Sequence, residues 1–198
     1  MRITLRLGML GTIDSHPDEE IVAISLQRKE VFGVLVRRYE ERLSRYLRRL
    51  GVFRKEDVED VLQNVFLKAY RNLNAFDQRL KFSSWIYRIA HNETVSFFRA
   101  RSVRPEGSMI PDGEDLLEQM PGILDVEGEA DKRIDGEALM QALYTLDAKH
   151  REIIILRYFE EREYSEISDI LQIPVSSVGT LLARAKKKLR ASYPDKLL

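Results

Sequence analysis

The chain has 198 residues, of which 32 are Lys or Arg and 32 are Asp or Glu, so its formal net charge is zero. This length suits one ordinary domain or two small ones, and no run of about 18 apolar residues is present that would span a bilayer. The absence of cysteine excludes disulfides, thiolate nucleophiles and zinc–thiolate sites. We therefore expect a soluble, cytoplasmic, charge-rich protein with an N-terminal extension over residues 1–17.

The charge is distributed unevenly along the chain. Residues 26–104 contain 18 basic and 9 acidic residues, whereas residues 105–131 contain nine acidic residues and no basic one. The acidic segment is also rich in Pro and Gly, a composition that cannot form a packed core and is typical of a linker. The sequence therefore predicts a basic module at 18–104, a flexible acidic linker at 105–132, and a second module at 133–198 with a basic end.

Both modules are predicted to be all-α, because apolar residues recur every three or four positions and no alternating strand pattern with hairpin turns occurs. One long helix is expected to end near Gly51, and a second to cover residues 55–73. The outer face of the second helix is either an ordinary solvated surface or a docking surface for another protein, with Leu67 as its apolar anchor. The residues on this face are Asp60, Gln63, Asn64, Leu67 and Arg71.

Aromatic and cationic residues alternate in the next segment, residues 76–92. Such interleaving suits single-stranded nucleic acid, since rings stack on bases while Arg and Lys hold phosphates. Burial in a core explains Trp85 and its apolar neighbours better. We expect a helix to end at His91 and Asn92, so that these polar side chains precede a basic run at 99–104 and could read a base edge. The alternative for His91 is a polar surface or capping group rather than a metal ligand.

The second module has the layout of a helix-turn-helix. A short helix that Ser165 could cap is followed by a break at 172–174 and a last helix over about 175–190. Hydroxyls near the start of the last helix can approach base edges in a major groove, while later cations reach phosphates. A helical hairpin with a solvated basic face remains the alternative, and Gly179 inside the helix costs on the order of 1 kcal/mol.

The order of these parts resembles the extracytoplasmic-function (ECF) sigma factors, the small two-domain members of the bacterial sigma-70 family. Three stretches carry the resemblance, namely residues 57–70 (DVEDVLQNVFLKAY), 82–92 (FSSWIYRIAHN) and 164–189. The resemblance implies sigma region 2 in the first module and sigma region 4 in the second. It also implies an initiation factor that is not an enzyme and that has no cofactor and no metal.

The resemblance further implies three sets of contact residues. The residues implied to dock on the beta-prime clamp helices of core RNA polymerase are Asp57, Asp60, Gln63, Asn64, Phe66, Leu67 and Arg71. The residues implied to open and read the minus-10 promoter element are Lys81, Ser83, Arg88, His91, Asn92, Glu93, Thr94, Arg99 and Arg101. Among them, residues 91–94 are implied to form a loop that captures a flipped base. Reading of the minus-35 duplex falls to Ser176, Ser177, Thr180, Arg184, Lys187 and Lys188. Further expected partners are the beta flap and an anti-sigma factor, which can hold such a protein at the membrane.

Several positions depart from the family pattern. The family often has Gly-Asp where Arg28 and Lys29 stand, Gly at Gln172, and Lys and Arg at Gly179 and Leu181. We therefore expect weak minus-35 binding. Two other classes of protein share parts of this pattern. A stand-alone helix-turn-helix regulator would need a dimer interface or a receiver domain, which the first module does not suggest. An enzyme would need a catalytic constellation, and no Gly-rich phosphate loop or metal-ligand spacing is present.

Overall fold

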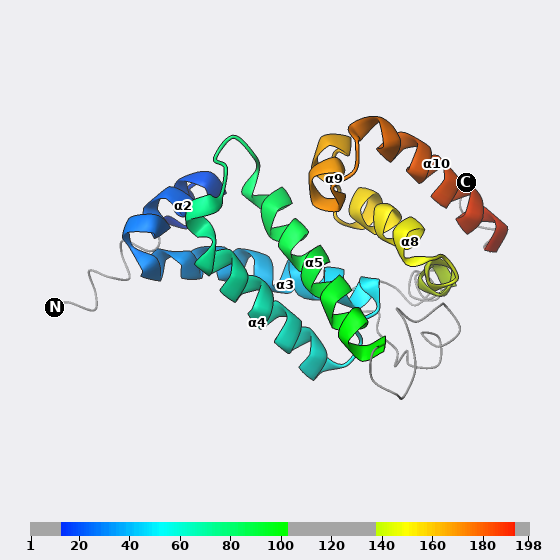
Figure 1. Ribbon diagram of the computed structural model, residues 1–198, viewed down its shortest axis with the longest axis horizontal. Helices are drawn as coiled ribbons and strands as arrows, with labels where there is room; N and C mark the ends of the chain where they lie inside the picture. The colour runs from blue at the N-terminus through cyan, green and yellow to red at the C-terminus, as the bar shows by residue number, and fades with distance from the viewer. Residues whose placement is uncertain (1–12, 103–137, 193–198) are drawn as a thin grey trace.

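The computed structural model describes residues 13–102 and 138–192 (Figure 1), and both ranges are helical without a strand, which confirms the all-α prediction. The acidic linker and most of the N-terminal extension lie outside the described residues, as do residues 193–198. The first domain contains α2 (Asp18–Gln27), a 3-10 turn (Lys29–Val31), α3 (Phe32–Leu50), α4 (Lys55–Arg71), a 3-10 turn (Leu73–Ala75) and α5 (Phe82–Ser102). The second domain contains a helical segment over 138–144, α8 (Ala148–Ile154), a π-helical turn (Ile155–Phe159), α9 (Tyr164–Leu171) and α10 (Val175–Ser192).

The core of the first domain forms where α3 packs on α4 and α4 packs on α5. Leu43 and Leu47 of α3 and Val65 of α4 are fully buried, and burial of each such side chain is worth about 1.5–3 kcal/mol. The predicted end of α3 is confirmed, because Gly51 adopts a left-handed φ of 110° and its N–H donates to carbonyls of the last turn. The second helix ends slightly earlier than predicted, at Arg71, and a 3-10 turn continues to Ala75.

Aromatic rings of the segment 76–92 lie in this core. The ring centroid of Phe76 is 5.3 Å from that of Trp85 and 5.7 Å from that of Phe82, in tilted and edge-to-face arrangements. Phe76, Phe82, Trp85 and Tyr87 are all at most 7% exposed. The prediction that Trp85 packs in the core is thus confirmed. In this fold the four buried rings cannot stack on bases.

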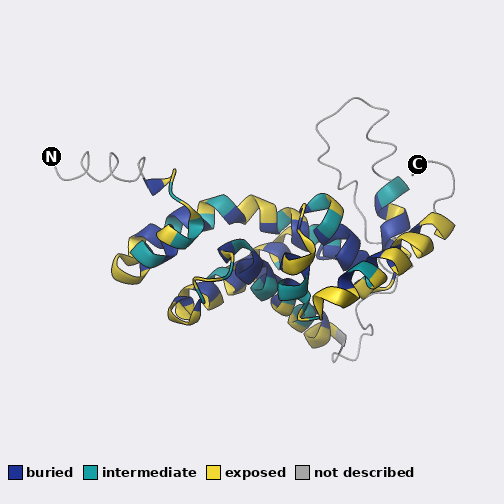
Figure 2. Ribbon diagram, turned by 90° about the horizontal axis from the view of Figure 1, so that it is seen from above, coloured by how far each residue is buried: buried dark blue, intermediate teal, exposed yellow. Residues whose placement is uncertain are grey.

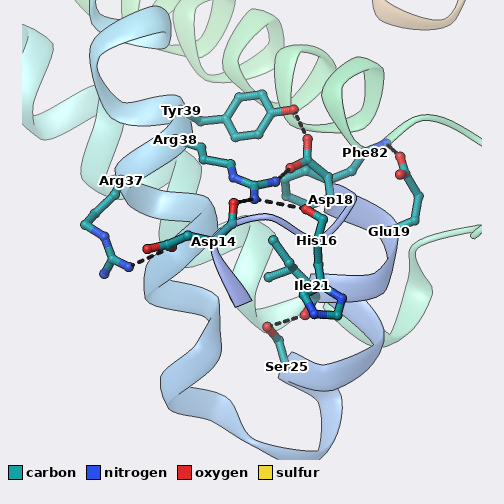
Figure 3. Close-up of polar contacts among 10 residues, drawn as sticks. All are labelled: Asp14, His16, Asp18, Glu19, Ile21, Ser25, Arg37, Arg38, Tyr39 and Phe82. Carbon is teal, nitrogen blue, oxygen red and sulfur yellow. Dashed lines mark hydrogen bonds and ion pairs between the residues drawn. The ribbon is translucent and has the colours of Figure 1, made fainter. Parts of the chain in front are cut away.

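The α2 helix is fixed to α3 and α5 by polar contacts (Figure 3). The Asp18 carboxylate accepts hydrogen bonds from Arg38, at 2.5 Å, and from the Tyr39 hydroxyl. Burial raises the pKa of Tyr39 most, and the hydrogen bond to Asp18 raises it further. The Glu19 carboxylate accepts the backbone N–H of Phe82 at 2.8 Å. Since Phe82 begins α5, Glu19 satisfies a free donor at the positive end of that helix.

The α5 helix corrects one prediction. It runs without interruption to Ser102, so the expected helix end at His91 and Asn92 is wrong. Residues 91–94 are helical and do not form the expected loop. No Gly or Pro lies between residues 82 and 102 to break the helix. Thr94 is instead accommodated inside it, because its hydroxyl donates to the carbonyl of Ala90 at 2.8 Å.

The second domain is built around the predicted helix-turn-helix of α9 and α10. Glu163, not Ser165, caps α9, through a capping box in which Glu163 and Glu166 each bond the other's backbone N–H. Gln172 ends the helix with a left-handed φ of 54°, a conformation that glycine adopts more easily. A Cβ at Gly179 would lie 3.5 Å from the Tyr164 ring, which is an ordinary contact.

The two domains pack against each other, since α5 lies along α9 and α3 contacts α8 (Figure 1). In Figure 2 the buried residues follow the inner faces of the helices, and the exposed residues lie on the outer surfaces. The domain contact therefore brings together helices that are far apart in the sequence.

Candidate nucleic-acid interface

The outer face of α4 carries the residues predicted to dock on another protein. Asp60, Gln63, Asn64, Leu67 and Arg71 are all exposed, and Leu67 is 43% exposed, far more than an apolar side chain in a core. Tyr70, which the sequence interpretation missed, is 37% exposed on the same helix. Tyr70 could have been found from its position three residues after Leu67, since such positions lie side by side on a helix.

Two other residues predicted for this docking surface are less accessible to a partner protein. Phe66 is partly buried against the core. The Asp57 carboxylate pairs with the Arg101 guanidinium at 2.7 Å. The accessible part of the α4 face therefore consists of Asp60, Gln63, Asn64, Leu67 and Arg71, with Tyr70 added.

The residues predicted to read the minus-10 element are divided by the structure into accessible and engaged groups. Asn92, Arg99 and Arg101 are exposed on α5, and the Arg101 guanidinium lies 5.2 Å from the centroid of the Phe97 ring. Glu93 and Thr94 are buried, and Glu93 pairs with Lys68 of α4. These two buried side chains stabilise the first domain internally. Ser83 and Arg88 are partly exposed.

Lys81 and His91 contact the second domain. The Lys81 ammonium lies 3.3 Å from a carboxylate oxygen of Glu166. The Nδ1 atom of His91 lies 2.7 Å from a carboxylate oxygen of Glu152. Burial lowers the pKa of His91, but the hydrogen bond and the charge of Glu152 outweigh it, so that the net shift is upward. Two residues predicted to meet promoter DNA are therefore engaged within the molecule.

The residues predicted to read the minus-35 element share one exposed face of α10. It consists of Ser176, Ser177, Thr180, Arg184, Lys187 and Lys188, all of them exposed. A shallow hollow beside it is lined by the first four of these together with Lys149, Ile173, Pro174 and Leu181. Lys149 was missed in the sequence, because it precedes the helix-turn-helix and only the fold brings it next to α10.

Lys188 is held by an acidic group in the same domain. Its ammonium lies 2.8 Å from the Asp147 carboxylate, which also accepts the backbone N–H of His150 as the N-cap of α8. Burial would raise the pKa of Asp147, but the hydrogen bonds from Lys188 and His150 outweigh it and hold that pKa well below its usual range. At neutral pH the Asp147 carboxylate thus neutralises part of the positive charge at this end of α10.

Comparison with known proteins identifies the family. The model of sigma-70 region 2 matches residues 35–104, and that of sigma-70 region 4 matches residues 136–189. The chain is 34% identical to the RNA polymerase sigma factor NccH of Alcaligenes xylosoxydans xylosoxydans, over 90% of this chain and 95% of that protein. It is 29% identical to the ECF RNA polymerase sigma factor SigW of Bacillus subtilis, over 84% of this chain and 91% of that protein.

Solved structures share the fold. CnrH in complex with the cytosolic domain of CnrY aligns with a TM-score of 0.65 and 24% identity over 91% of this chain and 99% of that chain. The sigma factor RpoE in complex with the anti-sigma factor NepR, from Bartonella quintana, aligns with a TM-score of 0.64 and 19% identity over 84% of this chain and 98% of that chain.

The matches to regions 2 and 4 place the chain among the sigma factors, which are non-enzymatic transcription initiation factors. The chain belongs to the ECF sigma factors of the sigma-70 family. Sigma factors bind core RNA polymerase and promoter DNA. Within residues 13–102 and 138–192, no group of His, Cys, Asp or Glu is arranged to hold a metal ion, and no helix there is long and apolar enough to cross a bilayer.

Proposed function

We propose that the outer face of α4 binds the beta-prime clamp helices of core RNA polymerase. The observation that carries this proposal is the exposure of Leu67 and Tyr70 among polar side chains on one helix face. Among the residues that the structure describes, Asp60 and Arg71 make no ion pair, so their charges are free to meet a partner. A small apolar centre with a charged rim is the usual composition of a protein docking surface.

Reconstitution with core RNA polymerase tests this proposal. Asp60→Lys reverses a charge on the α4 face and is expected to weaken polymerase binding at least about tenfold, equivalent to about 1.4 kcal/mol, with loss of template-dependent initiation. Glu40→Lys makes the same charge change at an exposed position of α3 and serves as the control. Equal loss in both variants would show that net charge, not this face, governs polymerase binding.

For promoter recognition we propose that α5 engages the minus-10 strand through Lys81, Arg88, His91, Asn92 and the arginines of its last turns. Unstacking a base costs a few kcal/mol. Contacts between α5 and the unstacked base offset this cost once polymerase holds the DNA open. Lys81 and His91 must then leave their carboxylate partners in the second domain. Potassium permanganate footprinting of thymines in the open complex tests this, with reduced reactivity expected for Arg88→Ala.

The exposed face of α10 is proposed to read the minus-35 duplex, and Lys149 to join it as a phosphate contact. Support comes from the hydroxyls of Ser176, Ser177 and Thr180 at the start of the helix and the cations that follow, an order suited to base edges first and phosphates later. Position-specific loss of promoter selectivity on Ser177→Ala, without loss of polymerase binding, would support this assignment.

We also propose control by an anti-sigma protein that binds both domains. The support comes from solved complexes of proteins with a similar fold. CnrH, which has a similar fold, is solved in complex with the cytosolic domain of CnrY, and the sigma factor RpoE of similar fold is solved with the anti-sigma factor NepR. Co-purification from the native host with the tagged full chain, followed by inhibition of reconstituted initiation by the captured protein, tests this proposal.

A further inference from the structure

The Asp147 side chain joins the start of α8 to the last turns of α10. Its carboxylate accepts the backbone N–H of His150 at 3.2 Å as the N-cap of α8. Each of its two oxygens also lies 2.7 Å from Nδ1 of the His150 ring. On the other side, the carboxylate lies 2.8 Å from the Lys188 ammonium of α10. Three groups from two helices therefore hold this one carboxylate in place.

Asp147 lies at the edge of the α10 face that is proposed to read the minus-35 duplex. A second shallow hollow, between the start of α8 and α10, is lined by Lys149, His150, Leu181, Arg184, Lys187 and Lys188. Both residues that bond to Asp147 are thus among the residues that line this hollow. The lining residues that the structure describes include four cations and no acid. Asp147 is therefore a negative charge placed directly against a positively charged surface.

The cations of this hollow differ in how far they are engaged within the molecule. The Lys188 side chain is 51% exposed, yet its ammonium is paired with Asp147. Arg184 and Lys187 are also exposed, and they make no ion pair with any residue that the structure describes. Of these three side chains on α10, only Arg184 and Lys187 can meet a phosphate without first leaving an acidic partner.

Transfer of the Lys188 ammonium from Asp147 to a DNA phosphate is opposed in two ways. A carboxylate and a phosphate accept the same charge-assisted hydrogen bonds, so Asp147 competes with the phosphate for the ammonium. The bonds from Lys188 and His150 hold the pKa of Asp147 well below its usual range, so the carboxylate is ionised at neutral pH. If Lys188 left, this charge would stay beside the DNA backbone, and charges of the same sign repel.

We propose that Asp147 keeps Lys188 from contacting the DNA backbone and thereby lowers the affinity of the α10 face for duplex DNA. The ligand concerned is the phosphate backbone of a duplex. Lys188, although predicted as a minus-35 contact, then serves to tie α10 to α8, and the phosphate contacts are made by Arg184, Lys187 and Lys149. This inference rests on the proposed minus-35 role of α10, and adds to it a residue that limits the strength of binding.

A double-mutant cycle on the full chain tests this inference. The measurement is the fluorescence anisotropy of a labelled duplex oligonucleotide of mixed sequence at several salt concentrations. Asp147→Asn removes the charge and keeps the N-cap, because asparagine caps a helix about as well as aspartate. It is expected to steepen the salt slope by about 0.9, which corresponds to about eightfold tighter binding at about 0.1 M salt.

The effect of Lys188→Met is expected to depend on Asp147. This substitution should remove about 0.9 from the slope in the Asp147→Asn background and almost none in the otherwise unmodified protein. A loss of about 0.9 in the otherwise unmodified protein would show that Lys188 already contacts a phosphate, and would overturn the proposal. So would a gain from Asp147→Asn that persists together with Lys188→Met, because the gain would then not come from Lys188.

Glu161→Gln is the control for net charge. It removes one negative charge from an exposed position in the loop before α9 and is expected to change the slope much less than Asp147→Asn. An equal gain in both variants would contradict the proposal. Asp147→Ser is a second test variant, because serine also caps a helix but carries no charge, and it is expected to reproduce the gain. Urea denaturation followed by circular dichroism establishes that each variant is folded.

Arg184→Met separates this inference from the proposed function. If the α10 face binds the duplex but Asp147 does not restrain Lys188, Arg184→Met lowers the salt slope by about 0.9, whereas Asp147→Asn does not raise it. If the α10 face does not bind the duplex, neither substitution changes the slope. The first result overturns this inference alone, and the second also overturns the assignment of α10 to the minus-35 duplex.

Discussion

His91 of α5 and Glu152 of α8 meet across the boundary between the two domains, with Nδ1 of the ring 2.7 Å from a carboxylate oxygen. The same oxygen accepts the Tyr46 hydroxyl from α3. This relationship joins three helices from both domains through one carboxylate. It makes the domain contact sensitive to any change in the charge of His91.

The first prediction concerns pH. The upward net shift of the His91 pKa means that the closed form, in which the two domains are in contact, favours the protonated ring. The stabilisation is therefore fully present below the ordinary pKa of 6.5 and is lost as the pH rises through the raised value. With spin labels at Glu40→Cys on α3 and Ala183→Cys on α10, both exposed positions, the fraction of molecules in which the two domains are in contact is expected to fall with rising pH through that range.

His91→Gln provides the control for the pH effect, because glutamine keeps a hydrogen-bonding group but does not titrate. Its closed fraction is expected to be independent of pH over the same range. The acidic group that faces the ring is Glu152, and the Tyr46 hydroxyl donates to the same carboxylate oxygen. Burial raises the pKa of the Tyr46 hydroxyl well above its usual value, so Tyr46 stays neutral over this range. A pH dependence that persists in His91→Gln would assign the effect to another group.

The second prediction concerns the attachment of α2. Glu19→Ala removes the carboxylate that accepts the Phe82 N–H at the start of α5 and is expected to lower the free energy of unfolding by about 0.5–2 kcal/mol. Urea denaturation followed by circular dichroism measures this. Glu20→Ala is the matched control, since Glu20 pairs only with His16 at the surface among the described residues. An equal effect in both variants would contradict a capping role.

The third prediction concerns the departures from the family pattern on α10. Gly179→Lys with Leu181→Arg is expected to steepen the salt dependence of duplex binding by up to about 1.8 units of slope, or about 0.9 for each new phosphate contact. The lysine fits, because a Cβ at Gly179 lies at an ordinary contact distance from Tyr164. Titrations of the full chain at several salt concentrations measure the slope. An equally steep slope without the substitutions would show that these contacts are not missing.

The fourth prediction concerns Lys149. If it contacts a phosphate beside α10, Lys149→Ala is expected to reduce the salt slope of duplex binding by about 0.9 while leaving the unfolding transition unchanged. Lys186→Ala is the control, because the Lys186 ammonium lies 5.0 Å from the centroid of the Tyr158 ring and is not part of the reading face. Loss of slope in the control alone would place the DNA on a different face of α10.

Local pattern in the sequence determined the helices and their faces. Apolar spacing and Gly51 define α3, and the exposed stripes of α4 and α10 follow from helical periodicity alone, because residues three or four apart share a face. The order of the three motif stretches was enough to indicate the sigma family. The predicted helix end at His91 is wrong, because polar residues alone do not end a helix and no Gly or Pro breaks α5.

Only the tertiary structure decided which charged residues meet. Glu152 and Glu160 look like ordinary surface acids in the sequence, yet folding buries them against Tyr46, His91, Tyr87 and Arg49. Their partners lie 61 to 111 positions away along the chain, beyond the reach of any local pattern. The zero net charge of the sequence is thus compatible with a nucleic-acid partner, because part of the basic surface is neutralised by acids that only the folded chain brings to it.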